Sequence, residues 1–253
     1  MLRNGFPCLP CLFCFAIFSA RLVSLAQGVP EKAYYARVNS FGAFAAYSND
    51  SSHMLLGVAE NRKLFNLGVS YNRRLLLNRY LDWQYSGEFL PVALESDPLQ
   101  VTVSTFTYTN PPLTISGTTT SPTLAACHDF SGSGSIPGGG PTYTFTATCT
   151  RRWTIGEAFS PVGFQWNLRP RSKIQPFFVG HGGYMYSSQT IPVSEAGNFN
   201  FTFDLGVGIE FFQTRTHSLR TEYRYHHISN DWTASQNPGI DSSLFQVGYV
   251  FGR

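Results

Sequence analysis

The feature that most constrains this chain is a thirteen-residue run in which apolar and polar residues alternate strictly. The apolar set is Phe199, Phe201, Phe203, Leu205, Val207, Ile209 and Phe211, and the intervening residues are polar, glycine or acidic. Successive side chains of a β-strand point to opposite faces, so this run predicts a strand with one apolar and one polar face. A strand of this length spans about 43 Å at ~3.3 Å per residue. A tilted strand needs only ~9–11 residues to cross a bilayer, so this run is long enough to do so.

The same alternation recurs along the chain and predicts an antiparallel barrel. Strand-like runs occupy 52–60, 63–76, 80–94, 155–168, 173–187, 198–213, 217–230 and 241–251. Eight is an even number, as single-chain outer-membrane barrels require. We therefore predict an all-β, eight-stranded antiparallel transmembrane β-barrel of the outer membrane, spanning 52–253. A ninth run at 39–48 is assigned to a lead-in over 27–51, or to an extension of the first strand, because counting it separately would break the parity.

A soluble alternative is a lipocalin-like barrel, whose apolar faces point inward around a ligand. Periodicity alone cannot separate inward from outward. The strand length, the aromatic content of 15% and the export signal favour the membrane barrel.

The N-terminus predicts a secretory signal over residues 1–26. Arg3 supplies a positive start, an apolar stretch follows, and Ser24-Leu25-Ala26 offers a cleavage site. The apolar stretch is shorter than the ~20 residues that a membrane anchor needs. Net charge is only +3 with scattered basic residues, so nothing indicates nucleic-acid binding.

The stretch 97–153 predicts one long extracellular loop, because it is rich in threonine, serine, proline and glycine. Short alternations within it indicate a β-hairpin. Cys127 and Cys149 are the two cysteines left after signal removal, and we predict that they form a disulfide in this loop. The sequence does not decide between a lid and an adhesion loop.

The candidate chemistry lies at the end of the chain, in His227, Ser229 and Asp241. Residues two apart share a strand face, and an antiparallel return would bring Asp241 level with them. Parity places all three on the lipid-facing side, at the outer end of the barrel, and His226 in the lumen. A nucleophile, a base and an orienting acid form a triad. The alternative is that the three are ordinary loop residues above the membrane.

The segments 225–230 and 237–241 resemble the lipid A 3-O-deacylases, PagL-type acyloxyacyl hydrolases. The blocks 176–183 and 204–208 are also similar to that family, whereas 97–153 is much longer than in its compact members. The resemblance covers 155–253 well and 52–94 loosely. It implies an esterase that hydrolyses the ester-linked 3-O-acyl chain of lipid A within lipopolysaccharide, among outer-membrane lipids, without metal or cofactor.

Carried over residue by residue, the resemblance makes Ser229 the nucleophile, His227 the general base and Asp241 the orienting acid. Asn237 would donate to the oxyanion, and Asn230 would hold the loop. Two positions depart from the family: the acid is commonly glutamate, and a small residue often stands where this chain has Trp232. A non-catalytic barrel with an adhesion or structural role is the second hypothesis. The sequence leaves the oligomeric state open, a homodimer included.

Overall fold

The computed structural model describes residues 34–110, 113–125, 127–138 and 140–253. The predicted signal over 1–26 lies outside these residues. The described residues form ten strands: β1 (Asn39–Ser48), β2 (Lys63–Leu77), β3 (Leu81–Asn110), β4 (Leu113–Leu124), β5 (Phe130–Ser135), β6 (Thr142–Leu168), β7 (Ile174–Ser187), β8 (Phe199–Phe212), β9 (His217–Ser229) and β10 (Ile240–Gly252). Over the described ranges, no helix is long and apolar enough to cross a membrane.

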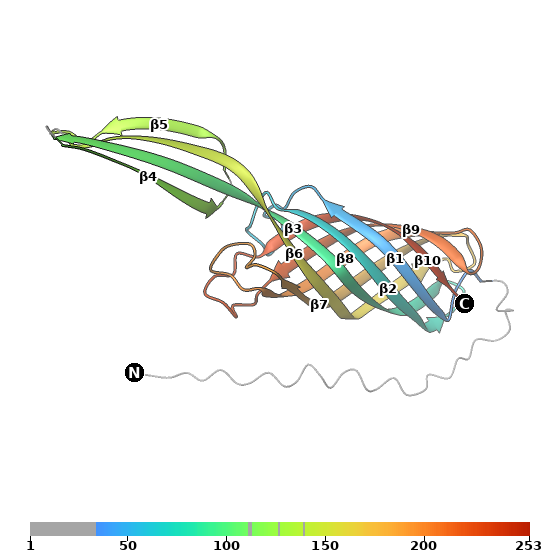
Figure 1. Ribbon diagram of the computed structural model, residues 1–253. Helices are drawn as coiled ribbons and strands as arrows, with labels where there is room; N and C mark the ends of the chain where they lie inside the picture. The colour runs from blue at the N-terminus through green and yellow to red at the C-terminus, as the bar shows by residue number, and fades with distance from the viewer. Residues whose placement is uncertain (1–33, 111–112, 126, 139) are drawn as a thin grey trace, which may run out of the picture. The chain divides into compact units, whose positions relative to one another are not determined.

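Eight of these strands form a closed antiparallel ring. Its order is β1-β2-β3-β6-β7-β8-β9-β10, and it closes through pairing of β10 with β1 and of β3 with β6 (Figure 1). The predicted eight-stranded barrel is therefore confirmed. Proline residues at 91 and 161 lie inside register shifts of β3 and β6, where a missing N–H costs no ladder hydrogen bond.

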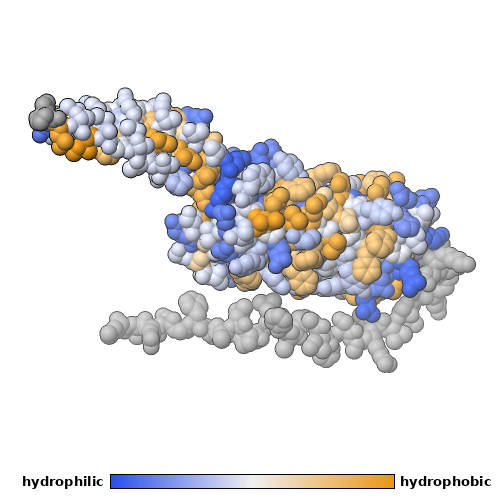
Figure 2. Space-filling model, in the orientation of Figure 1, coloured by the Kyte–Doolittle hydropathy of each residue, from blue (hydrophilic) through white to orange (hydrophobic). Residues whose placement is uncertain are grey.

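The outward face of the ring is apolar and the inward face is mostly polar. In β8 the phenylalanine, leucine, valine and isoleucine side chains named above are 38–54% exposed, whereas Asn200, Asp204 and Glu210 are at most 5% exposed. Figure 2 shows apolar side chains gathered over the barrel strands. An apolar exterior around a polar interior is the pattern of a membrane-spanning barrel and excludes the lipocalin-like alternative.

The predicted first strand, 52–60, is wrong. This segment belongs to the loop that links β1 to β2, and the first strand is β1, in the segment that we assigned to the lead-in. β1 alternates weakly because Phe44 points inward, into space that Gly68 of the paired strand leaves open: a Cβ there would lie 2.4 Å from the Phe44 ring. The strand count stays at eight because one strand replaces the other.

The predicted loop 97–153 is a four-stranded antiparallel sheet. β3 and β6 remain paired to each other beyond their last barrel partners, and β4 and β5 flank them in the order β4-β3-β6-β5. Cys127 and Cys149 are joined in a disulfide with Cα atoms 5.6 Å apart, which ties the β4–β5 connection to β6. The predicted hairpin and disulfide are both present.

An epitope tag between Pro137 and Gly138 is expected to be accessible to antibody on intact cells. The reason is that the long connections share one end of the barrel, opposite the short turns and the C-terminus, and long loops of such barrels are extracellular. A tag in the 170–172 turn is the matched control and should bind antibody only after permeabilisation. The reverse pattern would invert the assignment.

Candidate active site

The candidate site is built by the register between the last two strands. β9 and β10 are antiparallel neighbours in which Asp241 lies directly opposite His227. Odd-numbered side chains of β9 point outward and even-numbered ones inward, as Tyr223 (56% exposed) and Arg224 (3% exposed) show. His227 and Ser229 therefore share the outward face at the long-loop end of the barrel.

Asp241 is fully buried although it points outward. Its Oδ1 accepts hydrogen bonds from His227 Nδ1 at 2.6 Å and from the Tyr225 hydroxyl at 2.8 Å. Its Oδ2 accepts from the backbone N–H groups of Leu55 and Leu56, at 2.7 and 2.8 Å. These four groups all donate to the carboxylate. Because Nδ1 of His227 is bound to Asp241, Nε2 is the ring nitrogen left to act on a substrate or a nucleophile.

Ser229 is bound to the loop rather than to the imidazole. Its Oγ contacts both ends of the Asn237 amide, donating to Oδ1 at 3.0 Å and accepting from Nδ2 at 2.9 Å. It also accepts from the backbone N–H of Asp231 at 3.1 Å. Among the described residues, no hydrogen bond joins Ser229 to His227. Only the His–Asp half of a triad is therefore formed at rest.

Asn230 organises the connection between the two strands. Its side chain donates to the Gln236 carbonyl at 2.6 Å and accepts from the Trp232 N–H at 2.9 Å. Asp231 and Trp232 have positive φ angles of 50° and 59°, which turn the chain sharply after the nucleophile candidate. This turn is what points the Asp231 N–H back at Ser229.

All five predicted site residues lie together, but sequence reasoning missed several of their partners. The missed groups are the Tyr225 hydroxyl, the Asp231 N–H and the two amides of the β1–β2 loop. The tyrosine could have been found, since it is two residues before His227 on the same face. The β1–β2 loop could not, because about 185 residues separate it from Asp241 along the chain.

The outward surface next to the site is aromatic. Phe201 and Phe203 of β8 lie opposite Ser229 and His227 in the ladder, and both are more than 40% exposed. Phe201 packs on Phe199, which stacks on Tyr184. Such a wall suits contact with hydrocarbon chains.

The barrel interior holds a second Ser-His-Asp arrangement. His181 Nδ1 lies 3.0 Å from Asp204 Oδ1, and His181 Nε2 lies 2.9 Å from Ser86 Oγ. The three come from strands far apart in sequence and are all at most 5% exposed, so no substrate reaches them.

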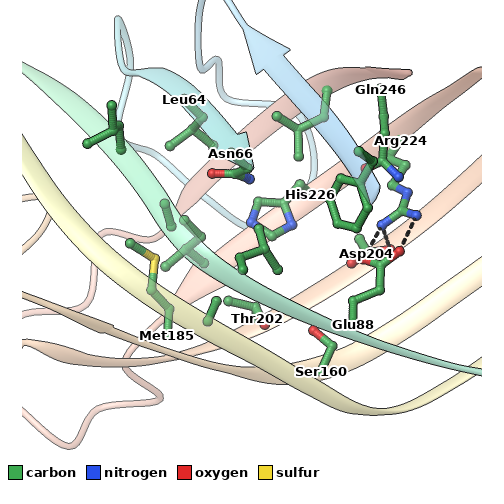
Figure 3. Close-up of a pocket in the computed structure, with 17 residues that line it drawn as sticks. Leu64, Asn66, Glu88, Ser160, Met185, Thr202, Asp204, Arg224, His226 and Gln246 are labelled. Carbon is green, nitrogen blue, oxygen red and sulfur yellow. Dashed lines mark hydrogen bonds and ion pairs between the residues drawn. The ribbon is translucent and has the colours of Figure 1, made fainter. Parts of the chain in front are cut away.

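The nearby interior pocket is too small for a substrate. Its volume is about 20 Å³, roughly room for one water molecule. Figure 3 shows His226, Asp204 and Arg224 among its lining residues, which confirms that His226 faces the lumen. None of Ser229, His227 and Asp241 lines it. This pocket therefore has no part in the candidate site on the outward face.

Glu88, His181 and Asp204 offer ligand atoms within 4.8 Å of one another, a spacing that a metal ion could use. The guanidinium of Arg224 already lies among them, 2.7 Å from Glu88 and 3.4 Å from Asp204. A cation there would be repelled by this fixed positive charge, so the group is better described as an ion-pair network.

Comparison with known proteins gives a family match. The family model for lipid A 3-O-deacylase (PagL) matches residues 129–250. No curated protein sequence matches the chain.

Among solved structures, the outer membrane enzyme PagL is 13% identical and superposes with a TM-score of 0.44, covering 84% of this chain and 99% of its own. Neisserial surface protein A is 13% identical with a TM-score of 0.42, over 85% and 97%. OprG from Pseudomonas aeruginosa is 10% identical with a TM-score of 0.39, over 86% and 98%. The barrel assignment rests on the strand pairing of this chain rather than on these superpositions.

The closed ring, its apolar exterior and the family match place the protein in the bacterial outer membrane. The match begins just before β5 and runs through β6 to β10, so it includes every predicted site residue. Through residues 129–250, this chain matches the lipid A 3-O-deacylase (PagL) family.

Proposed function

We propose that this barrel is an esterase that hydrolyses the ester-linked 3-O-acyl chain of lipid A, with Ser229, His227 and Asp241 as its triad. The observation that carries the proposal is the His227–Asp241 pair, 2.6 Å apart, on the outward face and two residues from Ser229. The family match supplies the substrate class. It does not favour the non-catalytic alternative.

The place of the residues suits a lipid substrate. The outward face at the end of a membrane barrel meets the acyl chains and head groups of the outer leaflet, so an ester of lipid A can reach Ser229 without leaving the membrane. The aromatic wall of Phe199, Phe201 and Phe203 lies beside it. The interior pocket lined by Glu88, Asp204 and His226, by contrast, is too small for an acyl chain.

The first half of the reaction forms an acyl-enzyme. Rotation of Ser229 about its Cα–Cβ bond takes Oγ from Asn237 toward His227 Nε2. The imidazole takes the hydroxyl proton while Oγ attacks the ester carbonyl carbon, and Asp241 stabilises the imidazolium. The tetrahedral intermediate collapses, the bond from the carbonyl carbon to the 3-oxygen breaks, and His227 returns the proton to that oxygen.

The second half releases the fatty acid. Water, deprotonated by His227, attacks the acyl carbonyl, and the proton returns to Ser229 Oγ as the acyl bond breaks. The net change is one ester and one water converted to one carboxylic acid and one alcohol.

Two donors are placed for the oxyanion. Asn237 Nδ2 and the Asp231 N–H both contact Ser229 Oγ at rest, at 2.9 and 3.1 Å. Once Oγ has rotated away, both N–H groups face the space where the carbonyl oxygen gains charge. Each such donor contributes about 2.7–4 kcal/mol in comparable sites.

The test is mass spectrometry of purified lipid A after incubation with the detergent-solubilised protein. We expect one acyl chain to be lost from the 3-O position and to appear as free fatty acid. Lipid A that lacks the 3-O-linked chain is the control substrate and should keep its mass. An unchanged mass for both substrates would contradict this activity and would favour the alternative hypothesis, a non-catalytic barrel with an adhesion or structural role.

A further inference from the structure

We propose that the loop 49–62, between β1 and β2, is the element that positions Asp241, and that Gly57 is its indispensable residue. The proposal rests on the proposed function, because it assigns the loop a role in the orientation of the triad's acid. In this view the nucleophile and base come from one hairpin, whereas the alignment of the acid comes from the other end of the chain.

The loop is anchored to the β9–β10 hairpin by its backbone. Ser51 and Ala59 form isolated bridges with Ser242 and Ile240. The N–H groups of Val58 and Ala59 donate to the carbonyls of Pro238 and Gly239, at 2.7 and 3.0 Å. These contacts flank Asp241 on both sides, so the intervening loop residues are fixed directly over its carboxylate.

The two oxygens of the Asp241 carboxylate have different partners. The N–H groups of Leu55 and Leu56 occupy Oδ2, which leaves Oδ1 for His227 and Tyr225. A carboxylate with only one oxygen bound can rotate about its Cβ–Cγ bond. Two amides on the far oxygen remove that freedom and keep Oδ1 in line with the imidazole.

The loop acts through its backbone rather than through its side chains. Leu55 and Leu56 are 72% and 65% exposed, so their side chains do not pack on Asp241. The donors are main-chain amides, which any residue except proline would supply. The residue type at positions 55 and 56 therefore matters less than the path of the backbone.

Gly57 sets that path. A Cβ at this position would lie 2.6 Å from the Asp241 backbone nitrogen, 2.8 Å from the Ile240 carbonyl carbon and 3.0 Å from Asp241 Oδ1. Two of these three are strand backbone atoms, which cannot move aside as a flexible side chain can. Any side chain at 57 must lift the loop away from the carboxylate and lengthen both amide hydrogen bonds.

The expected consequence is a loss of turnover without a loss of substrate binding. A displacement of about 1 Å in an orienting group can cost on the order of 10²-fold in rate. We expect Gly57→Ala to lower kcat by about that factor while KM changes less than about twofold, because the nucleophile and the aromatic wall are untouched.

The experiment compares Gly57→Ala with Gly197→Ala in the detergent-solubilised protein. Gly197 is a glycine of another long loop, and a Cβ there would meet nothing closer than 3.5 Å. It should keep the wild-type kcat. Both variants should retain heat-modifiable migration on gels, which shows that the barrel is folded.

A double-mutant cycle with Asp241→Ala separates positioning from a general structural effect. If Gly57 acts only through the acid, Gly57→Ala should cost nothing further once Asp241 is absent. Full additivity of the two losses, or a Gly57→Ala variant as active as Gly197→Ala, would overturn the proposal. Absence of deacylation by the wild type would instead contradict the proposed function, so the two failures are distinguishable.

Discussion

Ser229→Ala is expected to abolish release of the 3-O-linked acyl chain, a loss on the order of 10⁴–10⁶-fold by analogy with other hydroxyl nucleophiles. Alanine removes the proposed nucleophile, the hydroxyl oxygen that the two proposed oxyanion donors contact. His227→Ala should cause a similar loss, because the proton of Ser229 then has no acceptor. Mass spectrometry of lipid A after incubation with each variant gives the measurement.

Ser86→Ala is the matched control for this prediction. Ser86 also belongs to a Ser-His-Asp arrangement, with hydrogen-bond distances of 2.9 and 3.0 Å, but it is buried in the lumen. If chemistry takes place on the outward face, Ser86→Ala should keep wild-type turnover. Activity retained in Ser229→Ala and lost in Ser86→Ala would move the reaction to the interior and refute the proposed site.

Arg224→Ala is expected to destabilise the barrel by about 3–5 kcal/mol, the cost of breaking a buried ion pair by removing one partner. Arg224 is 3% exposed and lies 2.7 Å from both Glu88 and Glu222 and 3.4 Å from Asp204. Without the guanidinium, three buried carboxylates lose their shared cation and repel one another.

Thermal unfolding in detergent, followed by circular dichroism and by heat-modifiable migration on gels, measures this effect. Arg79→Ala is the control, since Arg79 is exposed in a short turn and should change Tm little. An Arg224→Ala barrel that unfolds at the wild-type temperature would show that the interior network adds nothing to stability.

Strand alternation predicted most of the barrel because the two faces of its strands meet different surroundings. From Phe199 to Phe211 in β8 every outward residue is apolar and every inward one is polar or glycine, so the period of two is unmistakable. β1 lacks this contrast, since Phe44 points inward and small residues occupy both faces. Periodicity therefore favoured 52–60, whose apolar residues Leu55, Leu56 and Val58 are instead exposed in a loop.

The candidate site was predictable to the extent that it is local in sequence. His227, Ser229 and Asp241 come from one hairpin, so strand parity and an antiparallel return suffice to bring them together. Two other sets of contacts join strands and loops that are far apart along the chain. They are the hydrogen bonds from the Leu55 and Leu56 amides to Asp241, and the interior group of Ser86, His181 and Asp204. Nothing in residue spacing encodes those contacts, which follow from closure of the ring.

The most direct measurement is to locate the reactive serine by covalent labelling. The purified wild-type barrel is treated with a fluorophosphonate, which reacts with activated serine hydroxyls, and its peptides are mapped by mass spectrometry. Our account predicts that the label is on Ser229, that it stops lipid A deacylation, and that it is lost in His227→Ala. A label on Ser86 or on any other serine, with inhibition of deacylation, would contradict it.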